Sequence, residues 1–162
     1  MFTARIERRL KWLGFKALAA LYRGPTKVKV GFPAGEAEAD IVQRAMWQEF
    51  GTKGGGWGGP IPERPFMRNA MRANRDKYRR FMQVAAMNTL NAGSSGLALR
   101  TGSPLRNSLD QIGILAQGDI QAEITSLRSP PNSPVTIKLK GSSNPLISSG
   151  EMRQKVTWKV ED

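Results

Sequence analysis

Two short segments near the ends of the chain, TKVKVGF and KVTWKV, alternate apolar and charged residues, and they constrain the fold most. The apolar positions are Val28, Val30 and Phe32 in the first segment and Val156, Trp158 and Val160 in the second; the lysines between or beside them are Lys27, Lys29, Lys155 and Lys159. Such alternation is typical of half-buried strands. We therefore expect the two segments to pair in one small antiparallel sheet.

The segments between these strands carry apolar residues at helical spacing. This spacing predicts helices over residues 3–22, 38–50, 65–91 and 104–127. In the second helix we expect Val42, Met46 and Phe50 on the apolar stripe, with Ile41 and Ala45 beside it. The stripe of the third helix is Met67, Met71, Tyr78, Met82 and Ala85, and that of the fourth is Leu105, Leu109, Ile112, Ala116, Ile120, Ile124 and Leu127. Methionine fills irregular gaps in cores, so we interpret the methionine stripe as packing and expect no cofactor. The resulting fold class is α+β, with the sheet packed against long amphipathic helices.

Shorter segments near the C-terminus give weaker signals. Residues 134–141 suit either a strand, by alternation, or one short helix after Ser133 and Pro134. Ser148 and Glu151 stand at capping-box spacing, which predicts a brief helical turn. The chain has 162 residues, a length that favours a single domain over residues 1–162. Breaker-rich composition predicts a flexible glycine-rich arm at 51–60 and a mobile connection at 92–103.

The chain contains no cysteine and no histidine. Thiol nucleophiles, Ser-His-Asp triads and the usual zinc sites are thereby excluded, and we expect neither an enzyme nor a bound metal. The formal net charge is +12, which favours a polyanion as a neighbour. No apolar run approaches the roughly 18 residues that a membrane span needs, so we expect no membrane partner.

Glu36, Glu38 and Asp40 form the only tight acidic cluster, at a predicted helix start. Acids at this spacing either ligate a hard cation or complement the dipole of the helix N-terminus. If the cluster ligates a cation, the chain could be an enzyme that works with a divalent metal held by Glu36, Glu38 and Asp40.

The stretch EFGTKGGGWGGPIPERPFM contains a formal G-x-G-x-x-G at Gly54, Gly56 and Gly59. A dinucleotide site needs such glycines after a strand and before a helix, whereas these follow a helix and run into prolines. We interpret the segment as a surface loop. Trp57 at its centre either anchors the loop in a partner or folds back on its own domain. Candidate interface residues are Gly54, Gly56, Trp57, Arg64 and Phe66.

Arg68, Arg72, Arg75 and Arg79 fall on one face of the predicted third helix. Such a row could follow nucleic-acid phosphates through charge alone, or it could be a solvated face or pair with an acidic neighbour. Lys27 and Lys29 on the first strand share this ambiguity. All six are candidates for a face that meets DNA or an acidic partner.

Three short blocks resemble the neck and minor-tail (head–tail joining, tail-completion) proteins of long-tailed double-stranded DNA bacteriophages. They are Glu49-Phe50-Gly51-Thr52, Arg64-Pro65-Phe66 and Pro145-Leu146-Ile147-Ser148-Ser149-Gly150. The resemblance covers about residues 28–160; Ser148 and Ser149 stand where the family typically has Asp-Thr, and the glycine stretch is longer than usual.

The resemblance implies a structural virion protein without catalytic residues, made in the cytoplasm of the bacterial host. It implies a homo-oligomeric ring, with six copies expected from tail symmetry, at the neck or at the head-proximal end of the tail. Such a ring serves as connector or tail terminator, contacts neighbouring neck, connector or tail-tube proteins, and lets double-stranded DNA pass through its lumen. The alternative hypothesis is a non-specific DNA-binding protein that acts outside the virion.

Overall fold

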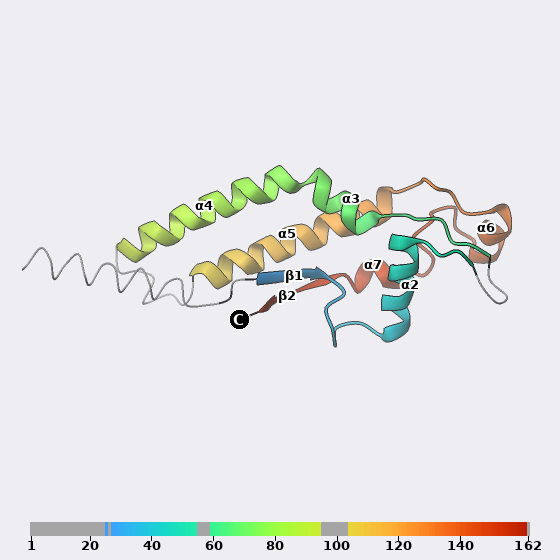
Figure 1. Ribbon diagram of the computed structural model, residues 1–162, viewed down its shortest axis with the longest axis horizontal. Coiled ribbons are helices and arrows are strands. Elements are labelled where there is room, and N and C mark those ends of the chain that lie inside the picture. Colours follow the sequence, from blue (N-terminus) through green and yellow to red (C-terminus); the bar gives the residue numbers. More distant parts are fainter. Residues whose placement is uncertain (1–24, 26, 55–58, 95–103, 162) are drawn as a thin grey trace, which may run out of the picture. The chain divides into compact units, whose positions relative to one another are not determined.

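The computed structural model describes residues 25, 27–54, 59–94 and 104–161 (Figure 1). Its elements in chain order are β1 (Lys27–Gly31), α2 (Ala39–Phe50), α3 (Phe66–Ala73), α4 (Arg75–Ser94), α5 (Pro104–Ser126), α6 (Pro134–Lys140), α7 (Glu151–Gln154) and β2 (Thr157–Glu161). The expected helix over 3–22 lies outside the described residues. So does most of the expected connection at 92–103, whose first three residues belong to the end of α4.

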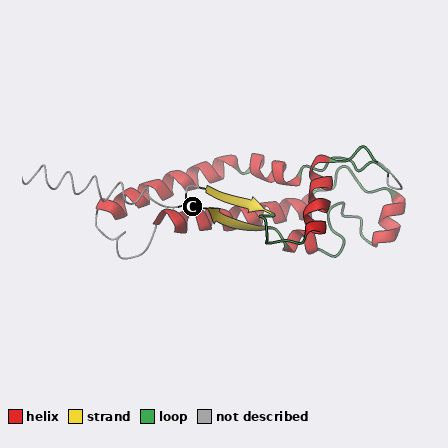
Figure 2. Ribbon diagram, turned by 60° about the horizontal axis from the view of Figure 1, so that its bottom comes forward, coloured by secondary structure: helices red, strands yellow, loops and turns green. Residues whose placement is uncertain are grey.

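β1 and β2 pair as a two-stranded antiparallel sheet, and most of the residues that the structure describes are helical (Figure 2). The predicted α+β class is confirmed. In β1 the lysines are exposed while Val28 and Val30 are half-buried. In β2 Lys159 is exposed between half-buried Trp158 and Val160, but Thr157 and Glu161 are half-buried too, so the predicted alternation is clear in β1 and only partial in β2. No helix in the described part of the chain is long and apolar enough to cross a membrane.

Contacts divide the chain into two compact units, each built from distant parts of the sequence. The described part of the first unit consists of residues 27–28, 76–94, 104–112 and 160–161. Ala85, Thr89, Leu109 and Ile112 are buried there, and the Thr89 hydroxyl donates a hydrogen bond to the Ala85 carbonyl. The second unit consists of residues 29–75 and 113–159. The single domain expected from the chain length stays a prediction.

The second unit holds the larger apolar core. Its buried members are Ile41, Ala45, Phe66, Ala70, Ile120, Ile124, Leu127, Leu146, Met152 and Val156. The α5 stripe supplies Ile120 and Ile124, as its 3.6-residue period predicts. The same stripe also supplies Leu109 and Ile112 to the first unit.

A close contact fixes one glycine of α5. A Cβ built on Gly113 would lie 2.3 Å from Cδ1 and 2.4 Å from Cγ of Trp158. Glycine at this position therefore lets β2 pack directly on the helix backbone. Gly118, five residues further along the helix, has no atom within 4 Å of such a Cβ.

The prediction of one continuous helix over residues 65–91 is wrong. The single helix expected over 65–91 is divided at Asn74, which lies between α3 and α4. The Asn74 side chain donates to the Ala70 carbonyl at 3.0 Å, and its backbone N–H donates to the same carbonyl. An asparagine side chain can offer the backbone an alternative to the regular helical bond.

The buried face of α2 also differs from the prediction. Ile41, Ala45 and Glu49 are buried, whereas Met46 and Phe50 are 54% and 63% exposed. The buried face of α2 is therefore the neighbouring row of Ile41, Ala45 and Glu49, which ends in a carboxylate, and not the expected apolar stripe.

The two C-terminal segments are also settled. Residues 134–141 form helix α6, with the Ser133 hydroxyl accepting from the Thr136 N–H at the N-cap and Gly141 in the left-handed conformation at the C-cap. The predicted helical turn at 151 is present as α7, but its cap is wrong. Gly150, with φ of 87°, takes the N-cap position, and no side chain of that residue can cap the helix.

Candidate functional site

The three sequence blocks that carry the family resemblance lie within the second unit, and Glu49 of the first block bonds the residues that directly follow the second. Its side chain is 1% exposed and accepts from the backbone N–H groups of Met67 at 2.9 Å and Arg68 at 3.2 Å. These are among the N–H groups of α3 that have no partner within the helix. The helix has no cap from its own N-cap residue, Pro65. Glu49 of α2 therefore caps α3 from another element, where a carboxylate also complements the helix dipole.

The side chain of Arg68 joins the same cluster. Its Nε donates to Glu49 Oε1 at 2.9 Å, and one Nη donates to the Glu49 carbonyl at 2.7 Å and also pairs with Glu63. Its guanidinium lies 5.3 Å from the centre of the Phe50 ring. The hydrogen bonds that Arg68 donates to Glu49 and then to Glu63 raise its pKa, so the guanidinium is held firmly in its charged form.

Arg64 of the second block lies in the interior. Its guanidinium donates to the Pro130 carbonyl (2.8 Å), to Gln48 Oε1 (2.6 Å), and to the Pro131 carbonyl and Asn132 Oδ1 (both 3.1 Å). Its backbone N–H donates to the Gln48 carbonyl at 2.7 Å. All four oxygens that accept from the Arg64 guanidinium are neutral, and burial lowers the pKa of Arg64. One side chain thus ties the end of α2 to the segment that leads into α6.

The candidate interface residues differ in whether their side chains are exposed. Arg64 is 3% exposed and Phe66 is 0% exposed, so neither side chain is available to a partner. Their assignment to an interface is corrected: Arg64 bonds inside the chain and Phe66 belongs to the core. Gly54 is exposed with φ of 82°, while Gly56 and Trp57 lie outside the described residues.

The glycine-rich loop is closed at its base. The Thr52 N–H donates to the Ile61 carbonyl at 2.9 Å, and the Ile61 N–H donates to the Thr52 carbonyl at 3.2 Å, which forms an isolated antiparallel bridge. Just before it, Gly51 has φ of 70°, and a Cβ there would lie 2.9 Å from the Ile61 carbonyl oxygen. The two described ends of the loop are therefore held together by backbone hydrogen bonds.

The third block is held by Asn144. Its Oδ1 accepts from the backbone N–H groups of Leu146 at 2.9 Å and Ile147 at 3.1 Å. Such an Asx-type turn directs the chain inward, and Pro145 and Leu146 are buried behind it. The Lys140 ammonium donates to the carbonyls of Asn144 and Pro145, both at 3.2 Å.

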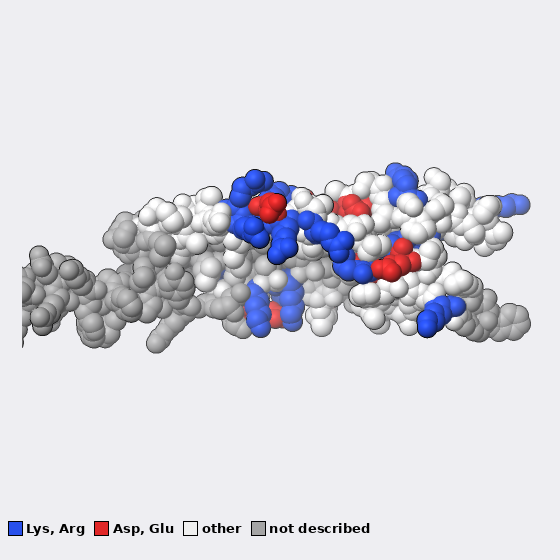
Figure 3. All heavy atoms as spheres, turned by 45° about the horizontal axis from the view of Figure 1, so that its top comes forward, with Lys and Arg blue, Asp and Glu red and all other residues white. Residues whose placement is uncertain are grey.

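The candidate DNA-facing or partner-facing residues lie in different parts of the fold. Arg68 is engaged as described, and Arg79 lies 3.8 Å from Asp76. Arg72 and Arg75 are exposed, and their side chains form no hydrogen bond or ion pair with the residues that the structure describes. Lys27 and Lys29 are exposed on β1. Figure 3 shows a face of the molecule on which Lys and Arg side chains gather.

Two members of the acidic cluster at the start of α2, Glu38 and Asp40, form ion pairs. Glu38 accepts from Lys155 Nζ at 2.9 Å, and this hydrogen bond lowers the pKa of the Glu38 carboxyl. Asp40 pairs with Arg44 at 2.9 Å. Within the described ranges no group of three or more His, Cys, Asp and Glu side chains is placed to hold a metal ion.

Sequence reasoning missed Glu49, Gln48 and Lys140 as organising residues. The signal that could have found Glu49 is its place four residues after Ala45 and eight after Ile41, on the row that the structure buries. Lys140 carried no comparable signal, because it contacts residues of a loop that has no periodicity. Comparison of the chain with protein-family models, with curated proteins and with solved structures gave no match.

Proposed function

We propose that the chain is a structural virion protein that forms a homo-oligomeric ring in the neck, or at the head-proximal end of the tail, of a long-tailed bacteriophage. In this role it completes the tail and joins it to the head, and DNA passes through the lumen. The protein acts by assembly and not by catalysis.

The observation that supports this proposal is that each of the first two resemblance blocks forms hydrogen bonds with residues directly beside the other. Glu49 of the first block caps the helix that follows the second, and Arg64 of the second bonds Gln48 beside the first. The third block supplies Leu146 to the same core. The three blocks therefore lie in one packed unit, which is the arrangement expected if they belong to one structural motif.

The charge distribution is compatible with DNA in the lumen. Arg72 and Arg75 have exposed side chains without an acidic partner among the described residues, so they remain able to neutralise phosphates. The same two residues favour the second candidate, a non-specific DNA-binding protein that acts outside the virion. The two candidates differ in whether the isolated chain binds DNA tightly or first assembles.

Experiments on the purified chain distinguish the two candidate functions. Sedimentation and negative-stain microscopy report rings, and fluorescence anisotropy with a labelled DNA duplex reports binding at several salt concentrations. The neck proposal predicts rings, or rings after a partner is added, with weak DNA binding by the monomer. Tight binding by the monomer with a steep salt dependence, and no assembly, favours the alternative.

Two double variants provide the matched comparison. Arg72→Gln with Arg75→Gln removes two charges from the candidate DNA face, and Lys138→Gln with Arg153→Gln removes two exposed charges elsewhere. If the alternative is right, the first pair lowers the slope of log affinity against log salt by about two, one for each arginine, whereas the second pair leaves it unchanged. Equal effects of the two pairs would show that only the overall charge matters.

A further inference from the structure

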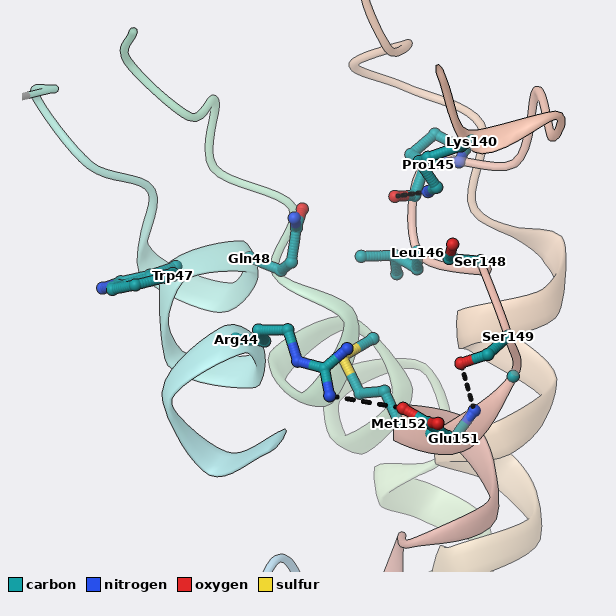
Figure 4. A pocket seen from close by; sticks show the side chains of 11 residues that line it. Arg44, Trp47, Gln48, Lys140, Pro145, Leu146, Ser148, Ser149, Glu151 and Met152 are labelled. Atoms are coloured by element: carbon teal, nitrogen blue, oxygen red, sulfur yellow. Dashed lines mark hydrogen bonds and ion pairs between the residues drawn. The ribbon is translucent and has the colours of Figure 1, made fainter. Parts of the chain in front are cut away.

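A groove lies in the second unit between α2 and the segment of residues 145–152, with a volume of about 210 Å³ (Figure 4). Leu146 and Met152 form part of its apolar lining, and the Leu146 side chain points toward α2. Arg44 closes one end by pairing with Glu151 at 3.3 Å. The remaining wall includes Gln48, Lys140, Pro145, Ser148 and Ser149.

The groove has a positive end without a compensating carboxylate. Lys140 lines it and donates only to two backbone carbonyls, which leaves the third N–H of its ammonium without a bond in the part of the chain that is described. Burial, and then the charge of Arg64, lower the pKa of Lys140. Both cations are therefore held among neutral oxygens, and an added carboxylate would relieve their repulsion.

We propose that this groove binds an acidic segment of a partner protein, with an apolar side chain in the groove beside Leu146 and Met152, of which 6% and 9% are exposed, and a carboxylate accepting from Lys140. The apolar lining selects a segment with a hydrophobic side chain, and the positive end selects an acid next to it. A carboxylate bonded to an ammonium is among the stronger hydrogen bonds in proteins, and it is stronger still beside an apolar wall.

Charge favours a different protein over a second copy of this chain as the occupant. Each copy carries a formal net charge of +12, so two copies repel one another, whereas an acidic partner is attracted. The inference is independent of the neck proposal, since it names the chemistry of the occupant and not the assembly in which it resides.

The test uses the full chain and a short fluorescein-labelled peptide of alternating leucine and aspartate, with anisotropy as the readout. A peptide with asparagine in place of aspartate is the ligand control. We expect saturable, salt-sensitive binding of the aspartate peptide and a loss of about tenfold or more with the asparagine peptide, as for removal of a charged hydrogen bond.

Two pairs of variants locate the binding. Lys140→Gln removes the ammonium in the groove, and Lys138→Gln removes the same charge from the exposed side of α6. Ser148→Glu places a competing carboxylate on the groove wall, and Ser143→Glu adds the same charge outside it. We expect about a tenfold loss for the first member of each pair and less than about a twofold change for the second.

Circular dichroism and thermal melts accompany each variant, and Ser148→Glu keeps the test valid if Lys140→Gln destabilises the fold. Absence of saturable binding by the wild type, or equal losses within each pair, would overturn the proposal. Concentration-dependent self-association that Lys140→Gln abolishes would assign the groove to a second copy and would also overturn it.

Discussion

Gly113 and Gly118 are two glycines of one helix with opposite surroundings. At Gly113 any side chain meets Trp158, whereas at Gly118 there is open space. Glycine weakens a helix interior relative to alanine, so its presence at Gly113 has a packing reason that Gly118 lacks.

Alanine at each position should therefore have effects of opposite sign. Gly113→Ala is expected to lower the free energy of unfolding by about 1–3 kcal/mol, because it overpacks the contact with Trp158. Gly118→Ala is expected to raise the free energy of unfolding by about 0.5–1 kcal/mol through helix propensity. Urea denaturation of both variants measures this, and a stabilised Gly113→Ala variant would contradict the packing.

Glu49 and Glu63 provide a second matched pair, since both accept from the Arg68 side chain but only Glu49 is buried. Glu49→Gln presents an amide NH₂ to donors that need an acceptor, and we expect a loss of about 1–3 kcal/mol in the free energy of unfolding. Glu63→Gln, at a half-exposed position, should cost less than about 1 kcal/mol. Equal losses in denaturant titrations would mean that Glu49 does not cap α3.

Arg64 tests the link between α2 and the segment before α6. Lysine keeps the charge but cannot supply the planar set of donors that reaches four oxygens. Arg64→Lys is therefore expected to cost about 2–3 kcal/mol of stability, from lost charged hydrogen bonds and unsatisfied acceptors. Thermal unfolding checks this, with Arg128→Lys, an exposed arginine, as the control; a loss no larger than that control would contradict the role given to Arg64.

Among the elements, those with a regular period were predictable and those fixed by a single polar contact were not. The α5 stripe and the two strands follow directly from hydrophobic spacing. The stripe of α2 was wrong because Glu49, a residue that spacing treats as polar and exposed, is buried against the amides of α3. The break at Asn74 likewise depends on one side chain, and Gly150 replaces the expected serine cap through a positive φ that sequence spacing does not reveal.

The glycine-rich loop is the element whose role is most open to experiment. Thr52 and Ile61 pair at its base, so residues 53–60 can be exchanged for the two-residue turn Asn-Gly without breaking that bridge. Under the neck proposal, this exchange and Trp57→Ala should leave the melting temperature nearly unchanged but impair ring assembly in sedimentation. An unfolded Trp57→Ala variant would show instead that Trp57 is part of the core.

At the scale of the whole molecule, charge predicts a polyanion or an acidic protein as the partner, and burial then decides which candidate side chains are accessible to it. Arg64 and Phe66 were chosen from a motif, yet both serve the interior. A sequence motif shows which residue types the chain shares with the family that it resembles. It does not show whether a side chain faces outward, because packing decides that. Arg72 and Arg75 remain the exposed basic candidates, and the groove beside Lys140 adds a surface that no periodic pattern could reveal.

Under the neck proposal, the chain is encoded by a phage genome. Deletion of the gene from that genome, followed by electron microscopy of the lysate, tests this central claim most directly. The account predicts filled heads separated from tails that fail to join them, and restoration of complete virions by the wild-type chain supplied in trans. Normal virions in the deletion lysate would contradict a role in the neck or in tail completion.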